Sequence, residues 1–301
     1  MNAAVQNNTK ACIFCGTPLS SVNRAKEHVI AQTLLDKFDI LQVEFAHSHL
    51  QSSLGGWDGL QVTPPALARK FIYNKFLCGR VCGKCNHGWM SNLDNQVAPI
   101  LLRLAKSNQR IGHLPEEERS VLANWATKTA MVLSDTVQPG FGAIPRRHAS
   151  TFHQGGVFPD LFAVLAAKLS DAAEGFRFSF CSTWLVEAQS SAFGELSFGH
   201  AGAYKVFMQI KNIMFLVCFY PVYHATFLLA KRDATLLAST WPKMRYSPAS
   251  PSTFTEIMRF AMAASIRLPS EKEALYPPAA ATCYCGSGKL FGACCERLQR
   301  R

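Results

Sequence analysis

Cysteine spacing constrains this chain more than any other feature. Eight of its eleven cysteines fall into three tight groups. The N-terminal stretch lacks the apolar segment of a secretion signal, so we expect a cytoplasmic protein with reduced thiols. Clustered cysteines in a reducing compartment indicate metal sites rather than disulfides. The groups are Cys12 with Cys15, Cys82 with Cys85, and Cys283, Cys285, Cys294 and Cys295.

The first two groups each have CxxC spacing. Together they offer four thiolates, and structural zinc prefers a closed tetrahedral set of such ligands. We therefore expect a structural zinc site formed by Cys12, Cys15, Cys82 and Cys85. On the cysteines alone, a zinc ribbon with no catalytic role is the favoured interpretation.

Two further features accompany these cysteines. Glu27 and His28 begin twelve residues after Cys15, and Asn86 directly follows Cys85. This ordered combination of CxxC, an acidic–His pair and CxxCN resembles the HNH, or ββα-metal, nuclease family. The resemblance is closest to the branch of phage junction resolvases of the endonuclease VII type, and it covers roughly residues 10–95.

The resemblance implies a role for each of three side chains. Glu27 would be a ligand of a catalytic Mg or Mn ion, and Asn86 would fall at the second ligand position. His28 would be the general base, since a neutral imidazole can take a proton from water near pH 7. Adjacent strand residues point to opposite sides, so we expect a local bend or twist at Glu27 and His28.

The sequence departs from the family pattern at two of these positions. Glu27 replaces the commoner Asp, which lengthens the ligand arm, and Asn86 stands where many HNH enzymes have His. His87 is an alternative ligand to Asn86, although adjacent helical residues diverge by about 100°. Asn74 is a candidate for the loop-bracing Asn of the family name.

The third cysteine group resembles a different motif. Residues 283–295 match the CxCGSGK…CC pattern of the SEC-C metal-binding motif. We expect Cys283, Cys285, Cys294 and Cys295 to bind a second zinc, which would supply most of the folding free energy of so short a segment. The resemblance implies a docking element for protein or nucleic acid, and a passive terminal staple is the alternative.

The expected fold class is α+β. A chain of 301 residues, 49% of them hydrophobic, can bury a sizeable core. We expect a ββα-metal, zinc-bound nuclease module at 1–106, a middle domain of helices and antiparallel sheet at 107–275, and a zinc knob at 276–301.

Apolar periodicity predicts the main helices and strands. The expected helices are Gln32 to Phe38, a helix after Cys85 that Pro99 kinks or splits, one from Glu116 to about Leu133, and one capped at Thr253 that reaches Arg267. The expected strands are an alternating run from Phe176 to Val186 and a hairpin of Tyr204–Ile210 and Ile213–Tyr220 that turns at Lys211 and Asn212.

The favoured function is metal-dependent hydrolysis of phosphodiester bonds in DNA, with RNA as an alternative substrate. A net charge of +11 suits a polyphosphate partner, although a basic surface is also a common solubility device. The rivals are a non-catalytic double-zinc nucleic-acid-binding protein and a zinc-stabilised protein adaptor, neither of which needs Glu27, His28 or Asn86. Family analogy alone suggests a setting in bacterial restriction or phage defence. The longest apolar run, Ile213 to Val222, is too short to span a membrane.

Overall fold

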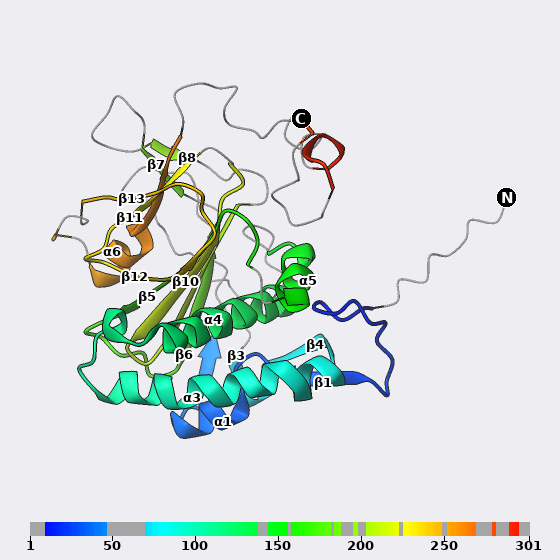
Figure 1. The fold of residues 1–301 in the computed structure, drawn as a ribbon. Helices are drawn as coiled ribbons and strands as arrows, with labels where there is room; N and C mark the ends of the chain where they lie inside the picture. The colour runs from blue at the N-terminus through cyan, green and yellow to red at the C-terminus, as the bar shows by residue number, and fades with distance from the viewer. Residues whose placement is uncertain are drawn as a thin grey trace.

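The fold begins with a two-stranded antiparallel sheet that leads into a long helix (Figure 1). The computed structural model describes residues 10–46, 70–137, 144–155, 158–181, 184–187, 195–197, 203–222, 225–248, 252–253, 255–268, 279–280 and 289–294. In the first sheet β1 (Arg24–His28) pairs with β4 (Leu77–Cys82). The chain then runs through α2 (Gly83–Cys85) and η2 (Asn86–Met90) into α3 (Ser91–Lys106).

The helix after Cys85 differs from the expectation in where it is interrupted. Gly88, with φ −90° and ψ −115°, lies outside the helical region, and the backbone around it follows a π-helical turn. Pro99 does not split α3. The Pro99 ring lies on an exposed side of the helix, so water can satisfy the carbonyl that its missing N–H leaves free. The short helix α1 (Gln32–Lys37) confirms the predicted one.

A second long helix, α4 (Glu116–Val137), lies between α3 and the main sheet (Figure 1). Every residue from 125 to 134 is buried, because this part of the helix is covered on all sides. Pro115 and three glutamates in the first turn begin it, as the sequence predicts. The following helix, α5 (Arg146–Gly155), packs against α4.

The main sheet has five antiparallel strands in the order β12-β5-β10-β9-β6. The predicted hairpin is present, with Ile210 opposite Ile213 and a positive φ of 51° at Lys211. All seven residues of the central strand β10 are buried, as a strand covered on both faces requires. The five strands are β12 (Thr235–Ser239), β5 (Phe162–Lys168), β10 (Ile213–Phe219), β9 (Tyr204–Ile210) and β6 (Phe176–Cys181).

A second five-stranded sheet, in the order β13-β11-β14-β7-β8, contains both parallel and antiparallel pairs. The α+β class is therefore confirmed, with more sheet than expected. The strands are β13 (Met244–Tyr246), β11 (Thr226–Leu229), β14 (Ala264–Arg267), β7 (Trp184–Glu187) and β8 (Glu195–Ser197). The remaining short elements are β2 (Glu44–Ala46), β3 (Lys70–Ile72), η1 (Tyr73–Lys75), η3 (Ile111–His113) and η5 (Phe291–Ala293).

Two predicted elements of this region were wrong in detail. The single strand expected from Phe176 to Val186 is two strands in different sheets, β6 and β7. The last helix, α6 (Glu256–Met262), is capped by Thr255 and not by Thr253, and the Thr255 hydroxyl accepts the Met258 N–H at 3.3 Å. The chain beyond α6 forms β14 instead of continuing as helix, because pairing with β11 and β7 satisfies its backbone.

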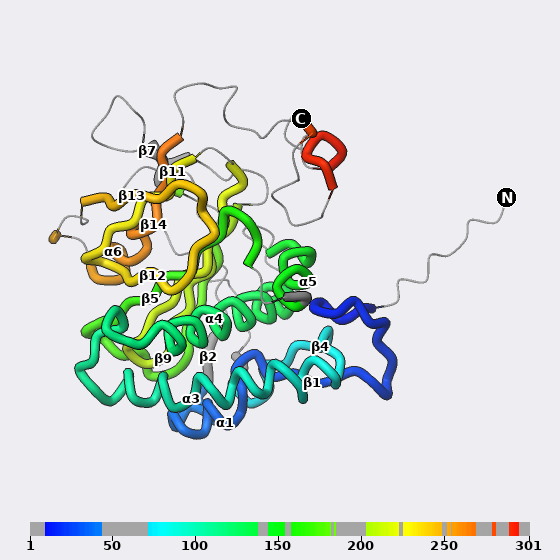
Figure 2. Tube along the Cα trace, viewed as in Figure 1, coloured from blue at the N-terminus to red at the C-terminus, as the bar shows by residue number. Residues whose placement is uncertain are grey.

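One apolar core runs from the β1–β4 sheet through α3 and α4 to the main sheet. Figure 2 shows the course of the chain through these elements. Tyr73 adds a specific anchor, because its hydroxyl donates to the Phe176 carbonyl and accepts the Phe176 N–H at 2.9 Å. Phe76 stacks on Phe178 beside it at 5.7 Å. The segment before β4 is thereby fastened to an edge strand of the main sheet.

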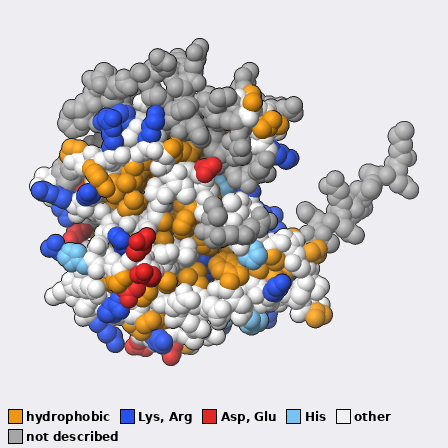
Figure 3. All heavy atoms as spheres, viewed as in Figure 1, with side chains coloured by type: hydrophobic (Ala, Val, Ile, Leu, Met, Phe, Trp, Pro, Cys, Tyr) orange, Lys and Arg blue, Asp and Glu red, His pale blue; other side chains and the backbone are white. Residues whose placement is uncertain are grey.

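Figure 3 shows Lys and Arg side chains spread over the visible described surface, with acidic side chains among them. Within the described residues, none of the helices combines the length and the apolar character needed to cross a membrane. Cys283, Cys285 and Cys295 lie outside the described residues, so the second zinc site remains a prediction.

Candidate metal centre and adjoining polar site

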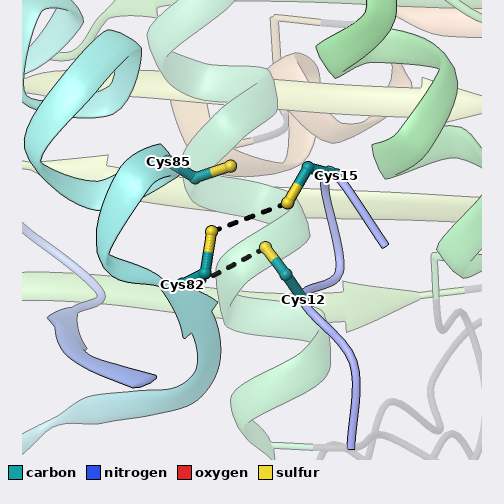
Figure 4. A group of neighbouring side chains, drawn as sticks. All are labelled: Cys12, Cys15, Cys82 and Cys85. Carbon is teal, nitrogen blue, oxygen red and sulfur yellow. Dashed lines mark hydrogen bonds between the residues drawn. The ribbon is translucent and has the colours of Figure 1, made fainter. Parts of the chain in front are cut away.

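Four cysteine side chains that the sequence groups in two pairs converge on one point (Figure 4). The sulfurs of Cys12, Cys15, Cys82 and Cys85 all lie within 4.8 Å of one another. Ligands of a tetrahedral zinc with Zn–S bonds of about 2.3 Å are about 3.8 Å apart. The separation of 3.5 Å between the Cys15 and Cys82 sulfurs fits this geometry. The set of four thiols could thus hold a metal ion such as zinc.

The first pair sits on a tight turn. Gly16 adopts a φ of +74°, which a glycine tolerates without strain, and its N–H donates to the Cys12 carbonyl at 3.0 Å. The Cys12 N–H donates to the Thr17 carbonyl at 2.9 Å, so the chain reverses around the two sulfurs. CxxC followed by Gly therefore brings two ligands together by local geometry alone.

The second pair lies where β4 passes into helix. The Cys82 N–H donates to the Cys12 sulfur at 3.4 Å, and the Gly83 N–H donates to the Asn23 carbonyl at 2.8 Å. These bonds join the end of β4 to the first turn and to the start of β1. Pairing of β1 with β4 is what brings the two cysteine pairs together from 70 residues apart.

The environments of these thiols differ from one another. Burial raises the pKa of Cys12 and of Cys85. Burial also acts to raise the pKa of Cys15, but hydrogen bonds with Thr17, Cys82 and Cys12 together outweigh it and lower that pKa to about 6. A bound cation would stabilise all four thiolates, and its binding would release protons.

A side chain from α5 completes the surroundings of the cluster. The His153 Nε2 lies 3.7 Å from the Cys85 sulfur, and the His153 ring lies 5.9 Å from that of Trp89. Trp89 also packs edge-on against Phe14 at 5.1 Å. The cluster is therefore covered by aromatic rings, and α5 contributes to it in a way that the sequence did not indicate.

Glu27 is a buried carboxylate on β1, opposite Cys78 of β4. It is 5% exposed, and within the described residues no hydrogen bond or ion pair reaches its carboxylate. Burial raises the pKa of Glu27 to about 7, the Lys128 charge opposes that shift, and the Asp94 charge adds to it. A buried carboxylate can bind a cation or can serve the fold, so the role of Glu27 as a metal ligand stays a prediction.

Lys128 and Asp94 form a buried polar group that the sequence did not single out. The Lys128 ammonium, with 0% of its side chain exposed, lies 2.7 Å from Asp94 Oδ1. The Trp125 indole N–H donates to the same oxygen at 3.0 Å. A lysine and an aspartate at these helical positions could each have been a solvated surface charge, and only the covering of α4 on all sides makes them buried.

His28 ends β1 on the opposite side of the strand from Glu27. The strand has a register shift between Ala25 and Glu27, whereas Glu27 and His28 themselves pair regularly with Cys78 and Leu77, so the local bend expected at Glu27 and His28 stays a prediction. The His28 Nε2 lies 3.1 Å from the backbone carbonyl of Asn74. Because a carbonyl can only accept, Nε2 carries the proton, and Nδ1 keeps its lone pair. Asn74 thus braces His28 through its main chain, while its side chain accepts from Gln32 at 2.5 Å.

Asn86 and His87 diverge at the start of the π-helical turn. Asn86 is half-buried and His87 is exposed. His87 instead lines an open hollow between β1 and α2. Within the described residues, no hydrogen bond or ion pair directly joins Glu27, His28 and Asn86 to one another.

No family model, no curated protein and no solved structure matches this chain. The chemistry of the site is therefore inferred from its own residues.

Proposed function

We propose that the chain is a metal-dependent endonuclease of the HNH type that hydrolyses phosphodiester bonds in DNA. The observation that carries the proposal is the state of His28, whose Nε2 is bound by the Asn74 carbonyl at 3.1 Å. This bond orients the ring and directs the lone pair to Nδ1. A half-buried histidine held in that tautomer is suited to accept a proton from water.

The local topology supports the same proposal. Two antiparallel strands, β1 and β4, lead into helix α3, which is the order of elements in a ββα-metal module. The cysteine cluster fastens the strand that bears His28 to the helix start that bears Asn86. Zinc in that cluster would have a structural role, because four sulfur ligands leave no open coordination position.

Glu27 and Asn86 are the residues that would hold a catalytic Mg or Mn ion. Such an ion would supply charge neutralisation at the scissile phosphate. Glu27 would supply a carboxylate and Asn86 an amide oxygen at the first turn of the helix. Because Glu27 and His28 lie on opposite sides of β1, the strand would have to twist for both to act on one phosphate. His28 would take the proton of the attacking water.

Nicking of supercoiled plasmid tests the proposal. His28→Ala should lower the cleavage rate about 10²- to 10⁴-fold with Mg or Mn present, because it removes the general base and leaves the cysteines in place. The matched control is His113→Ala, since His113 is an exposed histidine in η3 at the far end of α3. Equal rates in His28→Ala and wild type would refute the role of His28.

The rival function is non-catalytic binding of nucleic acid. The burial of Glu27 near the Asp94–Lys128 pair favours it, because a buried carboxylate can also serve the fold. Absence of nicking by the zinc-loaded wild-type protein with either metal, together with retained DNA binding, would support the rival.

A further inference from the structure

An open hollow lies between the start of β1 and the turn of α2, on the outer side of the strand. It encloses roughly 420 Å³. Its lining combines the apolar side chains of Val22 and Ala25 with the cationic side chains of Arg24 and Lys84. Cys82, Gly83 and the polar residues Thr17, Asn23 and His87 complete it. No acidic side chain lines it among the described residues.

The hollow is formed by fixed side chains and not by loose surface lysines alone. Arg24 Nε donates to the Gly79 carbonyl at 2.5 Å, and its guanidinium lies against Gly79. Among the described residues, no further hydrogen bond or ion pair is found at its terminal nitrogens. The Asn23 side chain accepts the Ser20 N–H at 2.7 Å and donates to the Pro18 carbonyl at 3.0 Å. An arginine already held on one side loses less conformational entropy when it binds a phosphate.

The hollow lies along the same strand as the proposed general base. Arg24 and His28 are the first and last residues of β1, which places their Cα atoms about 13 Å apart at roughly 3.3 Å per residue. Phosphates of one DNA strand are spaced by about 3.4 Å along the helix axis. A duplex cleaved at His28 would therefore bring a backbone phosphate a few nucleotides away to the level of the hollow.

We propose that this β1–α2 hollow binds a backbone phosphate of duplex DNA a few nucleotides from the scissile bond. Arg24 and Lys84 neutralise the phosphate, and Asn23, Thr17 and His87 offer polar partners at its rim. The proposal rests on the proposed nuclease function for its choice of ligand. Contacts with phosphates do not distinguish one base sequence from another. Their role is to fix the position of the duplex on the protein.

The other role open to these cations is to balance the cysteine cluster. Four thiolates around one zinc ion leave a net negative charge, and Cys82 belongs both to the cluster and to the lining of the hollow. The two roles differ in what the loss of the cations changes, because charge balance affects zinc retention and phosphate binding affects DNA affinity.

The salt dependence of DNA binding tests the proposal. Binding of the zinc-loaded full-length protein to a labelled 30-base-pair duplex is measured by fluorescence anisotropy across a range of NaCl, without added Mg or Mn. For Arg24→Gln/Lys84→Gln we expect the slope of log K against log[NaCl] to fall by about 0.9, since the hollow neutralises one phosphate and each neutralised phosphate contributes about 0.9. The matched control, Lys106→Gln/Arg110→Gln, removes the same charge from exposed positions near the far end of α3 and should change the slope by less than half as much.

A third variant moves the Arg24 guanidinium without changing the net charge of the protein. In Gly79→Ala the added methyl would collide with the Arg24 guanidinium and displace it. We expect this variant to lower the slope by less than the double variant does, because Lys84 still contacts the phosphate. Zinc content and plasmid nicking are measured for every variant.

The outcomes separate this proposal from the proposed function. Equal slope changes in the two double variants, loss of zinc from Arg24→Gln/Lys84→Gln, or tighter binding of single-stranded RNA of the same sequence would overturn it. If the slope falls as expected but wild type does not nick plasmid, the hollow stands and the nuclease function fails. If plasmid is nicked and the slope does not change, the nuclease function stands and the hollow is refuted.

Discussion

Replacing Lys128 by Met would leave the Asp94 carboxylate buried, with Trp125 as the one donor to it among the described residues. Asp94 is 6% exposed and Lys128 is 0% exposed, so solvent cannot take the place of the missing partner. Breaking a buried pair by removing one member typically costs about 3–5 kcal/mol. We expect Lys128→Met to fall in that range.

Removing the charge of the other partner, Asp94, should lower the free energy of unfolding by a similar amount. Asp94→Asn keeps an oxygen for the Trp125 N–H but leaves the Lys128 ammonium without its carboxylate. The double variant Asp94→Asn/Lys128→Met removes both charges and retains the bond with Trp125. Replacing a buried ion pair by neutral groups of similar volume is often neutral or stabilising, so the double variant should lie within about 1 kcal/mol of wild type. The coupling between the two positions would then be about 5–10 kcal/mol.

Urea unfolding of the zinc-loaded proteins measures this coupling. The unfolding midpoints of wild type, the two single variants and the double variant are compared. The comparison requires that the slope of the unfolding free energy against urea concentration is the same in all four, because a changed slope would signal a different denatured state. If the double variant is destabilised by the sum of the two single losses, the positions are independent and the inferred ion pair is wrong.

The remaining predictions concern metal content, pH and packing. Metal analysis should find two Zn per chain, one lost on deletion of residues 280–301 and the other in Cys85→Ser; a single Zn in the full chain would remove one of the two sites. Burial lowers the pKa of His148 from 6.5 to about 3, so the unfolded chain takes up a proton first and stability falls as the pH drops through that window, by up to about 1.4 kcal/mol per pH unit. His148→Gln should remove that part of the pH dependence in urea titrations at pH 7 and pH 5, and an unchanged difference would contradict the assignment. Gly175→Ala would place a methyl 2.8 Å from the Tyr73 hydroxyl and should lower the free energy of unfolding by about 1–3 kcal/mol. An unchanged melting temperature would show that the Tyr73 side chain can move away without loss of stability.

Local sequence signals predicted the parts of the site that depend on local geometry. Each CxxC pair brings two sulfurs together within one turn, and the order of the pairs indicated that both belong to one cluster. The hairpin turn at Lys211 and Asn212 is likewise a local feature, and its prediction was confirmed. The roles of Glu27 and His28 stay predictions, since their chemistry is untested.

Features that depend on what covers an element could not be predicted. Lys128 becomes a buried ion-pair partner only because α4 is enclosed between α3 and the main sheet. A helix covered on all sides has no polar face, so its periodicity says little about which charges are buried. Segment 264–267 is a strand because neighbours on both sides pair with it, although its spacing also suits the end of a helix.

The distance in sequence between the cysteine pairs has a consequence during synthesis. Cys82 lies 70 residues after Cys12, and a ribosome adds roughly 5–20 residues per second. For about 4–14 s the nascent chain therefore presents Cys12 and Cys15 without the second pair, so a metal ion could be held by two sulfurs only. In that interval the two thiols are open to oxidation and to competing soft metals such as copper. Correct loading of the centre would then depend on how reducing conditions and metal supply are controlled while the protein is being made.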